Sequence, residues 1–364
     1  MANKIIWSIR EVSIIILVNL FGVLILFLLF EGMTSILLLV RSARHQGLVS
    51  ERKHTQYDSE IGWINLPNLN IRNMYRGKTF ITNSMSFRND KEFGVDVPDK
   101  KVRVICSGDS FTMGYGVGNE EVWCSLLESM NNRIESVNLG QGGYGFDQAY
   151  LWYKRNSPKL GHDVHLFAFI TPDFTRMQSG TFLGYGKPLL VLKDNRLVNV
   201  NDPVPKQSYL FPRLPLYLQE LSQLNSIKMI GILKKKLFKK DASLELGKQD
   251  QKDRETQAVV EKIIEDLQRI NKDKNSILVL VHLPTVTDYK DKHSEKWRQF
   301  LHAESEKRGF VLIDLIEEIR KYSTQEVGQL FDGHYSEKGN AYIARKLYEK
   351  MQLVPEIAER FQRL

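Results

Sequence analysis

An apolar, β-branched run that breaks at a glycine, in residues 102–117, constrains the fold of this chain more than any other feature. Residues 102–106 have the pattern of a strand buried on both faces. Asp109 and Ser110 follow the break at Gly108, just before a glycine-rich loop. Loops at the C-terminal ends of parallel strands carry reactive side chains. The position therefore predicts Ser110 as a nucleophile, although Gly-Asp-Ser is also an ordinary turn sequence.

Strand and helix patterns alternate after residue 101. The clearest helix covers residues 255–270, whose apolar side chains fall on one face. This alternation predicts an α/β fold, a three-layer α/β/α sandwich with a mostly parallel sheet of about five strands. The expected strands are 102–106, 136–139, 165–171, 277–283 and 310–315.

Within the main domain, which we place at residues 101–355, the alternation lapses between 174 and 253. We interpret this stretch as an insertion on the core. Its basic run at 233–240 fits a solvated helix end, and a segment that binds a membrane surface or an acidic glycan is the alternative.

The N-terminal segment, residues 1–48, contains an almost wholly apolar stretch at 13–40. At about 1.5 Å per residue, this stretch is long enough to span a bilayer, and it predicts one transmembrane helix. A cleaved signal peptide is the alternative, but no small-x-small cleavage site follows. Basic residues flank both ends with an excess after the span, a count that would place the main domain in the cytoplasm; long domains translocate largely regardless of charge.

Residues 49–100 carry many turn signals between short apolar stretches. We expect a small β-rich lead-in packed on the main domain, because its aromatic side chains, Trp63 among them, would otherwise be exposed to water. A plain linker is the alternative.

Composition narrows the classes of function. The chain has 364 residues, 42% of them hydrophobic, which suffices for a full core. A formal charge of +8 favours anionic surfaces such as phospholipid. No zinc-finger or RNA-binding signature accompanies this charge, so nucleic acid is not an expected partner, and we expect neither a metal nor a cofactor. Cys106 and Cys124 form no paired motif and say little about the redox compartment.

A serine nucleophile needs a neighbouring base, usually a histidine that a carboxylate orients. Asp332 and His334 stand two residues apart after the last expected strand and before a helix pattern. They predict His334 as the base and Asp332 as its orienting acid. His282, at a strand end, is the alternative base. Structural roles are expected for the other histidines considered, which are His162, His165, His293 and His302.

The oxyanion of an acyl-transfer intermediate needs preorganised donors. The glycine-rich segment 138–145 follows the second strand, and its backbone N–H groups can approach a ligand closely. The N–H groups of Ser110 and Gly143 are therefore the predicted donors. The segment lacks the Gly-Lys-Ser/Thr ending of a phosphate loop, so nucleotide binding is not expected.

Together these blocks resemble the SGNH (GDSL-like) hydrolase family over about residues 101–350. Members are three-layer α/β/α serine esterases, lipases and acyltransferases, so the resemblance implies Ser110 as nucleophile, His334 as base and Asp332 as acid. Pro172 stands where the family has an asparagine that donates to the oxyanion, so that Thr171 or another residue would have to take its place. Loss of one such donor can cost about 100- to 1000-fold in turnover. The spacing is Asp-x-His instead of the commoner Asp-x-x-His.

The lead-in also resembles membrane-anchored bacterial members, through Gly62-Trp63, Pro67-Asn68 and residues 83–88. Some of those act beside membrane-bound O-acyltransferases on exported polysaccharides. The resemblance thus implies a hydrolase or acyltransferase on O-acetyl groups of a cell-envelope polysaccharide, anchored in the bacterial inner membrane with its main domain in the periplasm. The alternatives are a weakly active or inactive domain that binds glycan or scaffolds an acyltransferase, and a lipase or lysophospholipase.

Overall fold

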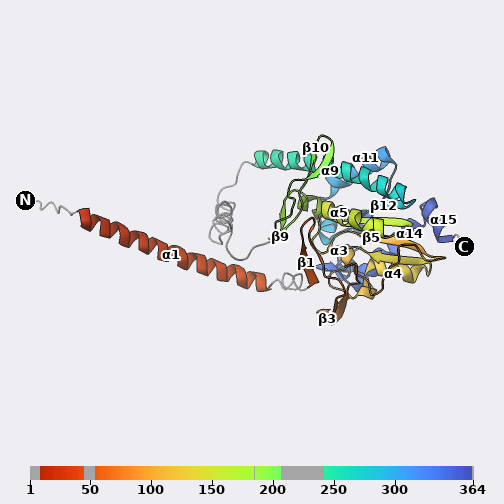
Figure 1. Ribbon diagram of the computed structural model, residues 1–364, viewed down its shortest axis with the longest axis horizontal. Coiled ribbons are helices and arrows are strands. Elements are labelled where there is room, and N and C mark those ends of the chain that lie inside the picture. The colour runs from red at the N-terminus through yellow and green to blue at the C-terminus, as the bar shows by residue number, and fades with distance from the viewer. Residues whose placement is uncertain (1–8, 45–53, 184, 206–241, 363–364) are drawn as a thin grey trace, which may run out of the picture. The chain divides into compact units, whose positions relative to one another are not determined.

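The computed structural model describes residues 9–44, 54–183, 185–205 and 242–362 of the chain (Figure 1). The chain divides into two compact units, one formed by residues 1–50 and 208–248 and the other by 51–207 and 249–364. The described part of the first unit is mainly the long helix α1 (Ile9–Arg44). The basic run at 233–240 lies outside the described residues.

The second unit is built on a five-stranded parallel sheet with the strand order β13-β12-β7-β5-β6. By order in the chain this is 5-4-3-1-2, a doubly wound arrangement that reverses between β5 and β7. Ligands of such sheets bind outside the carboxyl ends of the strands at this reversal. The strands are β5 (Val102–Ser107), β6 (Ile134–Asn138), β7 (Val164–Phe169), β12 (Ile277–His282) and β13 (Val311–Asp314).

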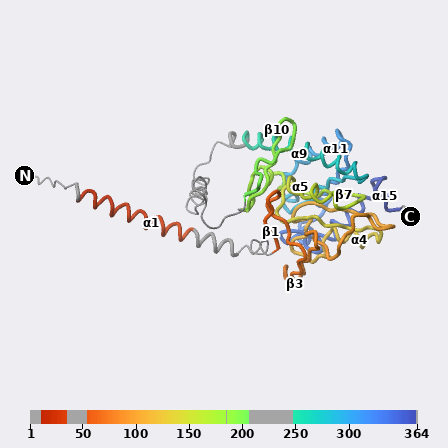
Figure 2. The backbone as a smooth tube through the Cα atoms, in the orientation of Figure 1, coloured from red at the N-terminus to blue at the C-terminus, as the bar shows by residue number. Residues whose placement is uncertain are grey.

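Helices cover both faces of the sheet, because successive strand residues point to opposite sides. Ile105 belongs to a core shared with α5, α9 and α11, whereas Val104 and Cys106 belong to one shared with α4, α14 and α15. Figures 1 and 2 show α9 and α11 on one side of the strands and α4 on the other. The predicted three-layer α/β/α fold is therefore confirmed. The large helices are α4 (Trp123–Met130), α5 (Phe146–Asn156), α9 (Ala242–Asp273), α11 (Glu295–Arg308), α14 (Glu337–Met351) and α15 (Pro355–Gln362).

Short helices and turns connect these elements. They are α3 (Ser110–Met113), η1 (Asn119–Glu121), η2 (Ser157–Lys159), α6 (Pro172–Arg176), α10 (Val286–Lys290), α12 (Ile316–Arg320) and α13 (Thr324–Leu330). The hairpin of β14 (Phe331–Asp332) and β15 (His334–Tyr335) precedes α14.

The lead-in forms two antiparallel hairpins and packs on the main domain, as the sequence predicts. Trp63 and Phe87 are buried in the same core as the sheet residues. A plain linker would leave these side chains in water. The hairpins are β1 (Thr55–Asp58) with β2 (Gly62–Asn65), and β3 (Asn70–Tyr75) with β4 (Lys78–Ile81).

The described part of the predicted insertion contains two further hairpins attached to the core. The fully buried Lys187 donates to the Asp147 carboxylate at 2.7 Å and holds this segment against α5. The hairpins are β8 (Thr181–Phe182) with β9 (Tyr185–Gly186), and β10 (Leu190–Lys193) with β11 (Arg196–Asn199). The domain boundaries themselves stay predictions.

Helix α1 contains an apolar stretch, Glu11–Thr34, of 24 residues. At about 1.5 Å per residue it is about 36 Å long, which exceeds the hydrocarbon thickness of about 30 Å in a bilayer. The stretch fits a membrane span by length and composition, and a signal sequence near the N-terminus fits the same description.

A disulfide joins Cys106 on β5 to Cys124 on α4, with their Cα atoms 6.2 Å apart. Both residues are fully buried. The bond therefore ties α4 to the strand that ends just before Ser110. The sequence shows no motif that pairs these cysteines, so only the fold reveals the bond.

Candidate active site

Ser110 begins α3 directly after β5, at the reversal point of the sheet. The Asp109 side chain caps this helix, because its Oδ1 accepts from the backbone N–H of Phe111 at 2.9 Å. Ser110 itself is only 4% exposed. The short strand-to-helix turn thus fixes the hydroxyl at the edge of the sheet where ligands bind.

His334 meets Ser110 from the other end of the chain. Its Nε2 lies 2.8 Å from Ser110 Oγ, within hydrogen-bond distance. The imidazole packs between the rings of Phe111 and Tyr115, whose centroids lie 4.6 and 4.8 Å from its own. Burial lowers the pKa of His334, while the nearby Asp109 charge opposes this change. A neutral imidazole in contact with the hydroxyl can accept its proton, which is the geometry of an activated serine.

Asp332 is paired with a cation instead of with His334. Its carboxylate forms an ion pair with Arg76 Nη1 at 3.0 Å, and its side chain is 72% exposed. Asp332 and His334 face each other across the β14–β15 hairpin, yet within the described residues no hydrogen bond joins them. The structure brings together the predicted nucleophile and base, and the role of Asp332 as orienting acid stays a prediction.

Arg176 is a site residue that the sequence analysis missed. Its Nη1 lies 3.1 Å from Asp109 Oδ2 and 2.6 Å from Asp173 Oδ1, and it donates to the Tyr144 carbonyl at 2.7 Å. Burial raises the pKa of Asp173, and the Asp109 charge adds to this effect while Arg176 opposes it. The guanidinium thus links the turn of Ser110 to the glycine-rich loop. The signal in the sequence was the i, i+3 spacing of Asp173 and Arg176.

The glycine-rich loop lies along the turn that carries Ser110. The Gln141 N–H donates to the Gly108 carbonyl at 3.1 Å, and Asn138 Nδ2 donates to the Thr112 carbonyl at 2.9 Å. A Cβ on Gly140 would lie 2.2 Å from the backbone nitrogen of Met113, so only glycine permits this approach.

Gly143, the predicted second oxyanion donor, has a φ of +75°, a conformation that favours glycine. A Cβ there would lie 2.8 Å from a ring carbon of Phe182. Trp63 and Phe182 line a small cavity beside this residue, together with His54, Thr55, Gly142, Leu183 and Tyr185. The assignment of Gly143 as donor stays a prediction.

Thr171, the predicted third donor, follows β7 just before Pro172 begins α6. Its Oγ1 lies 2.9 Å from His282 Nε2. Burial lowers the pKa of His282 to about 4, so the ring is neutral at pH 7 and carries one proton. When that proton is on Nδ1, the Thr171 hydroxyl donates to Nε2 and is not free to donate elsewhere. When the proton is on Nε2, the ring donates to Thr171 Oγ1, and the hydroxyl can donate to another acceptor. The alternative base His282 therefore contacts Thr171 instead of Ser110.

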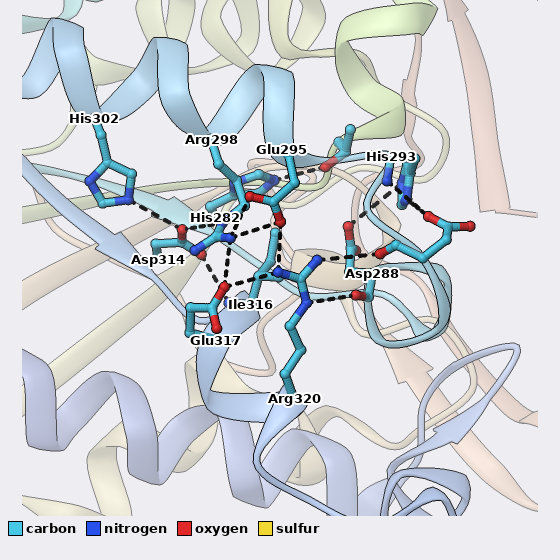
Figure 3. Close-up of polar contacts among 12 residues, drawn as sticks. His282, Asp288, His293, Glu295, Arg298, His302, Asp314, Ile316, Glu317 and Arg320 are labelled. Atoms are coloured by element: carbon cyan, nitrogen blue, oxygen red, sulfur yellow. Dashed lines mark hydrogen bonds and ion pairs between the residues drawn. The ribbon is translucent and has the colours of Figure 1, made fainter.

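His282 lies beside an ion-pair cluster at the ends of β12 and β13 (Figure 3). Arg298 Nε donates to Asp314 Oδ2 at 2.6 Å, and Arg320 Nη1 donates to Glu295 Oε1 at 2.6 Å. Asp314 also stabilises the protonated form of His282. This cluster is a structural network among helices and strand ends, and its members do not contact Ser110 or His334 by any hydrogen bond in the described part of the chain.

His162 and His165 lie in buried surroundings, where a structural role is expected. His165 contacts Ser107 Oγ at 2.5 Å inside the core, and His162 contacts the Tyr153 hydroxyl at 2.9 Å. Burial lowers the pKa of both rings. Among the described residues, no group of His, Cys, Asp or Glu is arranged to hold a metal ion.

Comparison with protein-family models and with curated proteins found no match. Among solved structures, the chain is similar to a member of the lipolytic protein G-D-S-L family from Veillonella parvula, with 13% identity, 68% of this chain and 97% of that chain covered, and a TM-score of 0.39. It is also similar to the psychrotrophic esterase EstA from Pseudoalteromonas sp., with 13% identity, coverage of 69% and 96%, and a TM-score of 0.39. These similarities are too remote to transfer an activity.

Proposed function

We propose that this protein is a membrane-anchored serine hydrolase or acyltransferase that cleaves ester bonds through an acyl-serine at Ser110. The observation that carries the proposal is the 2.8 Å contact between Ser110 Oγ and His334 Nε2 at the reversal point of a doubly wound sheet. A hydroxyl in this position lies where substrates reach the sheet, and the neutral imidazole beside it supplies the base.

The reaction begins when Ser110 Oγ attacks the ester carbonyl carbon and His334 Nε2 takes the hydroxyl proton. The N–H groups of Ser110 and Gly143 stabilise the negative charge that develops on the carbonyl oxygen. Collapse of this intermediate breaks the bond to the alcohol, which leaves with the proton from His334. Water then releases the acyl group as a carboxylic acid in an esterase, or a sugar hydroxyl takes it in an acyltransferase.

The proposed substrate is an O-acetyl group on a cell-envelope polysaccharide. The resemblance of the lead-in to membrane-anchored, polysaccharide-modifying proteins motivates this choice, as does the net charge of +8, which suits acidic glycans. A membrane-bound O-acyltransferase is the proposed partner. Acetyl and long-chain esters offered side by side would separate this substrate from the lipids of a lipase or lysophospholipase.

The proposed location is the bacterial inner membrane, with α1 as anchor and the catalytic unit in the periplasm. The disulfide between Cys106 and Cys124 favours this side, because such bonds persist in oxidising compartments and are rare in the cytosol. A reporter fused after residue 364 tests it: activity of a cytoplasmic reporter, with both cysteines open to alkylation once the protein is denatured without reductant, would place the unit inside.

A second candidate function is an inactive domain that binds glycan or scaffolds an acyltransferase. Pro172 at the start of α6 favours it, because proline offers no donor and Thr171 is engaged with His282.

Labelling of the full-length protein in detergent with a fluorophosphonate probe separates the two candidates. Labelling of the wild type that is lost in Ser110→Ala, together with loss of acetyl-ester hydrolysis, supports the enzyme. A folded wild type that neither reacts with the probe nor cleaves acetyl esters supports the scaffold.

A further inference from the structure

Three hydrogen bonds attach two residues of strand β2 in the lead-in, Trp63 and Asn65, to the glycine-rich loop. Trp63 Nε1 donates to the Gly142 carbonyl at 2.7 Å, and the Tyr144 hydroxyl donates to the Trp63 carbonyl at 2.6 Å. The Asn65 N–H donates to Gln141 Oε1 at 2.8 Å. All of these contacts are buried, so the lead-in packs directly against the loop.

The bond to Gly142 determines where the next N–H group points. The Gly142 carbonyl and the Gly143 N–H belong to the same planar, trans peptide, so they point in opposite directions. This peptide lies between two glycines, whose backbones rotate more freely than those of other residues. The indole N–H of Trp63 removes that freedom, because rotation of the peptide would leave the buried carbonyl without its partner.

The segments on either side of this peptide contact the turn of Ser110. On one side, the Gln141 N–H bonds to the Gly108 carbonyl. On the other, Arg176 Nη1 is shared by the Tyr144 carbonyl and Asp109. The peptide therefore spans a short loop that is held at both ends against the nucleophile and at its centre by Trp63.

We propose that Trp63 is a positioning residue of the reaction: its indole N–H holds the Gly142–Gly143 peptide so that the Gly143 N–H donates to the oxyanion. The inference rests on the proposed function of Ser110. The bond to the carbonyl also polarises the peptide and strengthens its N–H as a donor. With Pro172 in place of a side-chain donor, the oxyanion depends on Gly143 more heavily, so the lead-in affects catalysis through this peptide.

The test uses Trp63→Phe in the full-length protein, with Trp152→Phe as matched control. Trp152 is 3% exposed in the same core, and within the described residues its Nε1 has no hydrogen-bond partner. Both variants lose an indole, but only Trp63→Phe loses a hydrogen bond to the loop. Removal of a whole oxyanion donor costs about 100- to 1000-fold, so we expect a misdirected donor to lower kcat about 10- to 100-fold, with KM changed less than about threefold.

The measurements are kcat and KM for an acetyl ester, the rate of fluorophosphonate labelling and the thermal midpoint. Equal kcat for the two variants overturns the proposal. Where Trp63→Phe does not fold, replacement of Trp63 by benzothienylalanine, which exchanges the N–H for sulfur at nearly the same shape, tests the same hydrogen bond: wild-type kcat in that variant overturns the proposal. Failure of the proposed function is distinct, because it appears as activity that survives Ser110→Ala.

Discussion

Two hydroxyl–histidine pairs of nearly equal length, Ser110–His334 at 2.8 Å and Thr171–His282 at 2.9 Å, lie at the C-terminal edge of the same sheet. The first lies at the reversal of strand order, where doubly wound sheets bind ligands, and its histidine comes from a hairpin that follows the sheet. The second lies between β7 and β12, and its histidine is the last residue of a buried strand. The contact alone therefore does not define a nucleophile; its place on the sheet decides whether a substrate can reach it.

Their electrostatic surroundings differ as well. Asp314, fixed by Arg298, lies close enough to His282 to influence its pKa, whereas Asp109 is the main charge acting on His334. The His282 ring is neutral and buried beside an ion-pair cluster. The His334 environment presents a neutral ring to a hydroxyl through aromatic packing.

The largest expected effect separates the two hydroxyls. Ser110→Ala removes the attacking atom of the proposed reaction and should lower kcat by roughly 10⁴-fold or more, because the covalent route is then disabled. Thr171→Val, which keeps the shape, should lower kcat by about 10-fold at most, as expected for an auxiliary donor. Turnover of an acetyl ester by the two purified variants measures both. A larger loss in Thr171→Val than in Ser110→Ala would reverse the assignment.

The two histidines should differ in the same way. His334→Gln is expected to lower kcat by roughly 10³-fold or more, whereas His282→Gln should leave kcat within about 10-fold of wild type. His334 must be neutral to accept a proton, and its pKa lies below the ordinary 6.5, so kcat/KM should rise with pH through a midpoint below 6.5. A pH–rate profile with its acidic midpoint above 6.5 would contradict this electrostatic account.

The Ser110 region has a covalent support that the His282 region lacks, since the disulfide joins β5 to α4. The Cys106→Ala/Cys124→Ala variant should lose about 3 kcal/mol of unfolding free energy, because the bond closes a loop of sequence separation 18. Chemical denaturation of the oxidised and double-alanine proteins measures the difference. Hydrogen exchange that rises in α4 and β5 but not in β12 would show the effect to be local; equal stability of the two proteins would mean that the bond has no such role.

The sequence predicted the five-stranded sheet that carries both regions, because its strands are short apolar runs buried on both faces. The expected run 102–106 became Val102–Ser107, and 277–283 became Ile277–His282. The turn after the first run and the helix that begins just after His334 also followed from local patterns, whereas the hairpin that carries His334 did not. Such features depend on neighbours in the chain, which a pattern can capture.

Other parts of the site depend on contacts between distant segments, and no local pattern encodes them. The Trp63 bond to Gly142 spans 79 residues, and the Arg76 pair with Asp332 spans 256. The cysteine pair is likewise visible only when β5 and α4 pack together. The orientation of Asp332 could not be predicted, because the competing cation lies in another hairpin.

His282 should also affect stability, through its pKa of about 4. A folded pKa below the ordinary 6.5 means that the unfolded chain binds more protons as pH falls. This contribution to stability is therefore complete above about pH 6.5 and is lost as pH falls toward 4, with a size of about 1–3 kcal/mol. Urea unfolding between pH 7 and 4 should show a smaller decline in His282→Gln than in wild type. Identical pH dependence would mean that other groups dominate.

The smallest expected effect concerns Arg76. Its ion pair with Asp332 is largely exposed on both sides, so Arg76→Ala should change the unfolding free energy by less than about 0.5 kcal/mol. The same change frees Asp332, which faces His334 across the hairpin, to orient the imidazole. We therefore expect kcat in Arg76→Ala to stay level or rise by up to about threefold at low salt, with the difference shrinking at high salt as screening weakens the wild-type pair.

Asp332→Asn distinguishes the two ways in which His334 can be held. If Asp332 orients the ring during turnover, this variant loses much of kcat and the benefit of Arg76→Ala disappears in the double variant. If aromatic packing by Phe111 and Tyr115 suffices, Asp332→Asn keeps wild-type kcat, alone and combined with Arg76→Ala, and Tyr115→Ala causes the loss instead. The second result would remove Asp332 from the predicted triad and leave a serine–histidine pair whose base is held by ring contacts. The Ser110–His334 and Thr171–His282 pairs would then differ in the packing around the histidine more than in the charges near it.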